Sequence, residues 1–158
     1  FALLDEPKLW VPYFFVCYLY ARDFLVKNKL TFPALRAGED PVFLASCLVR
    51  TKSISVTSAT TYIYRRDGSA GQRRNTLPHL LDFIAHAEMV YHLYLQSGHQ
   101  LCWTEGCSEF YFNDVLLLAK QVQPEEPDRQ TVIEEIRKIW PTVSFEVIRQ
   151  MLVQDPQP

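Results

Sequence analysis

The stretch GEDPVFLASCL, residues 38–48, decides how this chain is organised, because it marks the start of a helix more clearly than any other part of the sequence. Asp40 is a preferred N-cap residue, and Pro41 suits the first helical position, where its missing N–H leaves no hydrogen bond unmade. The residues that follow are almost all apolar and supply a face for burial. We therefore predict a helix that begins at this Asp-Pro pair and packs against a core.

The segments on both sides of this helix combine short strands with one short helix. Residues 22–28 predict the helix, because an apolar run gives way there to charged side chains. Three segments are rich in β-branched and aromatic residues or too short for a helix, and predict strands: LTFP (30–33), SISV (53–56) and TTYIY (60–64). The expected fold class is α+β, a partial α/β domain of short strands and helices followed by a mostly helical C-terminal region.

Everything after residue 75 has helical patterning. Thr76 is a helix cap, Pro78 lies in the first turn, and Gly98 ends a long helix. Further helices are expected at 108–121, 131–140 and 144–153. We divide the chain accordingly into residues 1–75 and a helical C-terminal extension, residues 76–158.

The composition is that of an ordinary globular domain. The chain has 158 residues, 48% of them hydrophobic and 22% charged, and a net charge of -2. It is long enough to bury a core without disulfide or metal staples, and no whole-molecule field attracts it to nucleic acid. Its scattered cysteines favour a reducing compartment, and the CWTEGC segment matches no common zinc motif. We expect no nucleic-acid partner and no metal site within this chain.

Charge is nevertheless distributed unevenly along the sequence. Residues 50–74 contain six basic side chains and one acidic side chain, whereas the last third of the chain is acidic. A compact basic segment indicates a local site for an anion. The alternative interpretation, an exposed Arg-rich turn, stays open on the sequence alone.

The order of three motifs carries a resemblance to a known family. A short segment ending in Phe-Pro is followed by Gly-Glu-Asp opening a helix, and then by YIYRRDGS at 62–69. In this order and spacing, residues 10–71 resemble the acceptor-side half of family 2 glycosyltransferases, which are inverting nucleotide-sugar enzymes with a GT-A fold. The resemblance implies transfer of a sugar from a nucleotide-sugar donor to a hydroxyl of a polysaccharide or glycolipid acceptor.

The resemblance also implies roles for individual residues. Asp40 corresponds to the base that accepts the proton of the attacking hydroxyl, and Glu39 beside it helps to orient the acceptor or the loop. As an N-cap that accepts backbone N–H bonds, Asp40 is expected to have a lowered pKa. Trp10 lies in the region that adjoins the acceptor in the family.

The donor side of the site is implied by the same resemblance. Arg65, Arg66 and Ser69 match the position of a loop that closes over the donor diphosphate, and arginine grips phosphate oxygens with two parallel donors. The family holds a divalent metal, Mg or Mn, with an Asp-x-Asp motif, and this chain contains no such motif. We therefore expect a missing N-terminal nucleotide-binding half, an inactive isolated chain, and a cytoplasmic location, at the inner membrane face if the tail helices bind there. Whether the chain forms a homo-oligomer stays open.

The sequence also allows a function other than that of an enzyme. The rival function is a non-catalytic helical interaction module, in which Gly-Glu-Asp is only a helix cap. Four histidines follow at intervals of seven, six and seven residues, too far apart along a helix to share one metal ion. The four histidines are interpreted as surface or core-edge side chains: His79, His86, His92 and His99. The aromatic residues between positions 13 and 20 are interpreted as part of the core.

Overall fold

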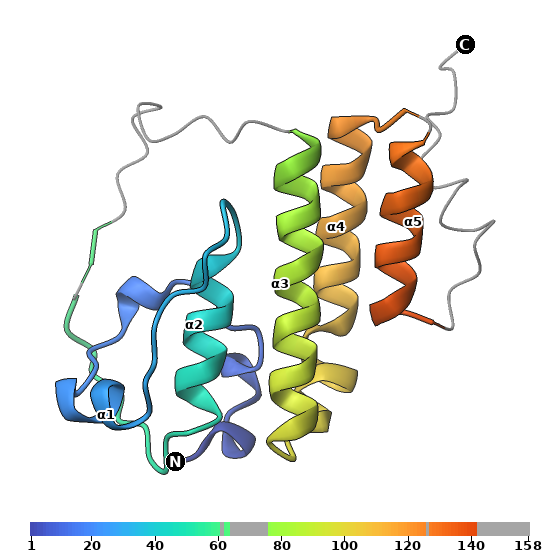
Figure 1. The fold of residues 1–158 in the computed structure, drawn as a ribbon. Coiled ribbons are helices and arrows are strands. Elements are labelled where there is room, and N and C mark those ends of the chain that lie inside the picture. The colour runs from blue at the N-terminus through green and yellow to red at the C-terminus, as the bar shows by residue number, and fades with distance from the viewer. Residues whose placement is uncertain (61, 64–75, 126, 142–158) are drawn as a thin grey trace.

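All regular elements in the described part of the chain are helical (Figure 1). The structure is a computed structural model that describes residues 1–60, 62–63, 76–125 and 127–141. The longer helices are α1 (Arg22–Lys27), α2 (Glu39–Leu48), α3 (Leu77–Gln96), α4 (Ser108–Val122) and α5 (Asp128–Ile139). The short elements are the 3-10 turns η1 (Leu3–Asp5), η2 (Pro7–Leu9) and η3 (Phe15–Cys17), and the π-helical turn η4 (Cys102–Cys107).

Helix α3 is the centre of the molecule. Helices α2, α4 and α5 all pack against it, and α3, α4 and α5 alternate in direction (Figure 1). The buried residues of α3 recur every three or four positions, so the helix presents one continuous apolar face, whose members are Leu80, Ile84, Ala87, Val90 and Tyr94. This face anchors the core of the protein.

Residues from both halves of the sequence contribute to a single core. Val42, Leu44 and Leu48 of α2 belong to the same buried cluster as the apolar face of α3 and the inner sides of α4 and α5. Because α2 packs directly on α3, the first turn of α2 is held at a fixed place beside the wall that α3 and α4 form.

The predicted α+β fold class is wrong, because no residue that the structure describes lies in a strand. Residues 30–33 and 53–56 are irregular, and the predicted strand at 60–64 lies partly outside the described residues. Ile54 exchanges two backbone hydrogen bonds with Phe1, at 2.8 and 3.4 Å. Such a pairing does not extend into a sheet here, and β-rich sequence without neighbouring strands gains little from an extended ladder.

Several predicted helices are confirmed. α1, α3 and α4 lie where the sequence places them, and Thr76 is the N-cap residue of α3. α5 begins at Asp128, earlier than expected, because an acidic residue in the first turn favours the helix N-terminus there. The helix predicted for 144–153 lies outside the described residues.

Candidate functional site

A pocket of about 620 Å³ opens at the first turn of α2. We call it the α2 pocket. Its walls come from the irregular N-terminal segment, the loop before α2, and one side each of α3 and α4. The lining residues are Tyr13, Phe14, Phe15, Val16, Arg36, Ala37, Gly38, Glu39, Asp40, Pro41, Tyr62, His79, Phe83, His86, Asp114, Leu117, Leu118 and Gln121.

The start of α2 differs by two residues from the prediction. Gly38, not Asp40, is the N-cap residue, and its φ of 82° lies in the left-handed region that glycine adopts most readily. Glu39 and Asp40 therefore lie in the first turn, where the helix dipole favours negative charge. Both carboxylates consequently lie at the pocket wall.

The pKa of Asp40 is raised above its ordinary value of 3.8, contrary to the lowering expected for an N-cap carboxylate. Partial burial removes water from the carboxylate, and the neighbouring Glu39 adds repulsion between like charges. A carboxylate with a raised pKa is a stronger proton acceptor, so the environment of Asp40 suits a general base.

His86 lies at the wall of the pocket and is fully buried. Among the described residues neither of its ring nitrogens has a hydrogen-bond partner. The ring packs edge-on against Phe83 and Tyr111, with centroids 4.4 and 5.1 Å away. Burial lowers the pKa of His86 to about 3, so the imidazole is neutral at physiological pH.

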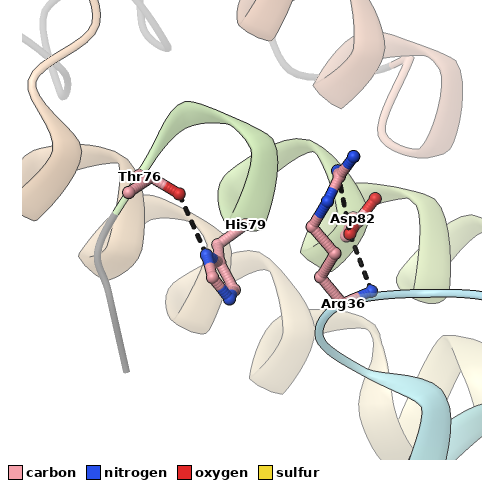
Figure 2. Close-up of polar contacts among 4 residues, drawn as sticks. All are labelled: Arg36, Thr76, His79 and Asp82. Carbon is pink, nitrogen blue, oxygen red and sulfur yellow. Dashed lines mark hydrogen bonds and ion pairs between the residues drawn. The ribbon is translucent and has the colours of Figure 1, made fainter. Parts of the chain in front are cut away.

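Polar contacts join two pairs of residues near the N-terminal end of α3, Arg36 with Asp82 and Thr76 with His79 (Figure 2). The backbone N–H of Arg36 donates to Asp82 Oδ2 at 2.8 Å, and the Arg36 guanidinium contacts the same oxygen at 3.4 Å. His79 Nδ1 lies 2.9 Å from Thr76 Oγ1. The Arg36–Asp82 contacts tie the loop before α2 to α3, and the Thr76–His79 contact restricts the orientation of the His79 ring.

The α4 wall adds a carboxylate and an amide. Asp114 and Gln121 line the pocket on the same side of α4 as Leu117 and Leu118. The hydroxyl of Tyr13 lies 3.4 Å from Asp114 Oδ2, which links the N-terminal segment to this wall. The pocket therefore combines aromatic rings with acidic and neutral polar groups.

The structure brings together only part of the predicted site. Glu39 and Asp40 line the same pocket. Trp10 lies apart from that lining: its indole N–H donates to Leu3 O at 3.0 Å, and its ring packs against Gly106. The predicted diphosphate-binding residues Arg65, Arg66 and Ser69 lie outside the described residues.

The sequence interpretation missed the α3 and α4 contributions to the pocket. His79, Phe83 and His86 follow each other at helical spacing along α3, and Asp114, Leu118 and Gln121 do so along α4. This spacing was a usable signal, but it does not say which face of each helix is buried. His86 proves to be a core residue with an unsatisfied polar ring.

Within the described ranges, no three His, Cys, Asp or Glu side chains are arranged so that they could hold an ion. None of the helices in the described part of the chain is long and apolar enough to cross a membrane.

Comparisons of this chain with family models, with curated proteins and with solved structures find no match.

Proposed function

We propose that this chain is the acceptor-side part of an inverting glycosyltransferase. Asp40 would accept the proton of the acceptor hydroxyl as that oxygen attacks the anomeric carbon of a nucleotide sugar. The observation that carries the proposal is that Asp40 lies in the wall of the α2 pocket with a raised pKa. The order of motifs at residues 30–69 is the second support.

The reaction requires a carboxylate that is ionised before the reaction and has enough affinity for a proton to take one from the acceptor hydroxyl. In a single displacement the acceptor oxygen loses its proton while the nucleoside diphosphate leaves, so the carboxylate must lie within hydrogen-bond reach of the hydroxyl. Partial burial, and secondarily repulsion from Glu39, raise the pKa of Asp40 and so keep its carboxylate basic. Glu39 itself remains at the pocket wall, where it can accept a hydrogen bond from a second acceptor hydroxyl.

The donor half of the reaction is proposed to come from a nucleotide-sugar site outside the described residues. Arg65, Arg66 and Ser69 remain proposed contacts to the donor diphosphate. A divalent metal, Mg or Mn, would be held by that further part, since the described residues offer no ligand set.

The proposal is tested by Asp40→Asn in the full-length enzyme. Asparagine keeps the size of the side chain but cannot accept the proton, so transfer should fall by about 10²–10⁴-fold. Asp128→Asn is the matched control, because Asp128 is also a first-turn acid but lies at the start of α5, away from the pocket. Normal transfer by Asp40→Asn would remove Asp40 as the base.

A non-catalytic interaction module is the second candidate function. One observation favours it: several large apolar side chains are strongly exposed, with Leu19 at 90%, Ile63 at 84% and Val56 at 79%. Exposed apolar side chains mark a surface for a partner where they form a contiguous patch. The two candidates differ in the transfer assay, since a module has no activity for Asp40→Asn to remove.

A further inference from the structure

Phe14 adopts a backbone conformation that bulky residues avoid. Its φ of 61° and ψ of 53° lie in the left-handed helical region. A Cβ atom clashes with the following carbonyl there, at a cost of roughly 1–2 kcal/mol. Residues held in such conformations gather at ligand sites, where the surrounding structure fixes them for a purpose other than stability.

The side chain of Phe14 contributes little to the packing of the core. The side chain is 66% exposed, although the residues on both sides of it are partly buried. Phe14 nevertheless lines the α2 pocket, which also contains Asp40. The left-handed backbone thus presents an aromatic ring at the edge of the cavity instead of in the core.

The rest of the pocket indicates which ligand would use this ring. Three carboxylates line it, from Glu39, Asp40 and Asp114, whereas Arg36 is the one Arg or Lys among the described lining residues. This balance disfavours an anionic ligand. An uncharged ligand with many hydroxyl groups suits it, because carboxylates accept hydrogen bonds from hydroxyls and an aromatic face covers the apolar C–H face of a sugar ring.

We propose that Phe14 is a stacking platform for a pyranose ring, and that the α2 pocket binds an uncharged saccharide between Phe14 and the α3–α4 wall. The inference rests on the proposed function only in calling that saccharide the acceptor. The binding claim stands on the lining of the α2 pocket and on the exposed ring and left-handed backbone of Phe14.

Saturation-transfer NMR on the full chain tests this, with the methyl β-pyranosides of glucose, galactose and N-acetylglucosamine as separate probes. At least one probe should receive saturation on its ring protons. Phe14→Ala should weaken that binding about fivefold or more, because the stacking face is lost. Phe14→Tyr should retain it. Leu19→Ala is the control, since Leu19 is even more exposed but does not line the pocket.

Saturation of none of the three probes, or equal saturation in Phe14→Ala, would overturn the inference. Asp40→Asn separates this outcome from failure of the proposed function. If binding depends on Phe14 while Asp40→Asn transfers normally, the saccharide site is right and the base is wrong. If Asp40→Asn abolishes transfer while no probe binds through Phe14, the base is right and the platform is wrong.

Discussion

The imidazole of His86 lies directly against the backbone of Gly38, with no room for a side chain between them. A Cβ atom at position 38 would overlap Nδ1, Cγ and Cβ of His86. Gly38 is also the N-cap residue of α2 and has a φ of 82°. Glycine at position 38 therefore allows the start of α2 to approach α3 as closely as it does.

Gly38→Ala should be strongly destabilising. The left-handed backbone costs an alanine about 1–2 kcal/mol, and overpacking against the ring adds roughly 1–3 kcal/mol. Gly98→Ala is the matched control, because Gly98 has a φ of 77° but no atom within 4 Å of its would-be Cβ. Urea unfolding of both variants measures the difference. Equal losses would show that the His86 contact contributes nothing.

Acid should weaken the fold through His86. Its pKa is lowered from 6.5 to about 3 in the folded state, so the unfolded chain binds the proton more tightly. The stability associated with the neutral ring is complete above the unfolded value and is lost as the pH falls from 6.5 toward 3. His86→Leu should show a flatter fall in the free energy of unfolding over that range.

Urea titrations at several pH values would measure this slope. His92→Leu serves as the control, because His92 is an exposed residue of the same helix, and its surface contact with Glu88 at 3.8 Å contributes little. An unchanged slope in His86→Leu would contradict the prediction.

The features that suit Asp40 to proton transfer should reduce stability. Its raised folded pKa means that the folded state binds a proton more readily than the unfolded chain, so the charged carboxylate destabilises the fold at neutral pH. Asp40→Asn should be more stable than the parent at pH 7, while Glu39 still interacts with the helix dipole. The gain should vanish below the unfolded value of 3.8, where both forms are neutral. Lower stability of Asp40→Asn at neutral pH would refute this.

Phe14→Gly should lose saccharide binding without losing stability. Glycine relieves the left-handed strain, and the greater freedom of the unfolded chain offsets part of that gain, so the net change should stay within about 1 kcal/mol. Phe15→Gly is the contrast: its ring packs on Phe32 and Phe43, at 5.0 and 6.2 Å, and its loss should cost about 3 kcal/mol. Thermal unfolding compares the two variants.

Local sequence signals predicted the helices better than the fold class. The cap at Thr76 and the apolar periodicity beyond it sufficed for α3, since both act within one segment. The strand predicted around Ile54 was wrong, because strand formation depends on neighbouring strands that no local pattern reveals. For the same reason the sequence predicts Asp40 as the N-cap residue of α2, whereas the structure has Gly38 there. The side chain that packs against Gly38 belongs to His86, which lies far along the chain.

The candidate site was predictable only on one side. Glu39 and Asp40 stand out in the sequence because they precede a clearly marked helix. The opposite wall, with His86 and Asp114, exists only once α2, α3 and α4 have packed together. Phe14 gave no signal, since an aromatic residue inside an apolar run is most often core.

Helix α3 supports α2, α4 and α5 simultaneously. A substitution at the α5 contact, for example at the fully buried Ile136, would displace both walls of the pocket although it touches neither. Among residues 13–16, by contrast, the exposed ring of Phe14 can change with little effect on the bundle, whereas Tyr13 and Phe15 pack against the core.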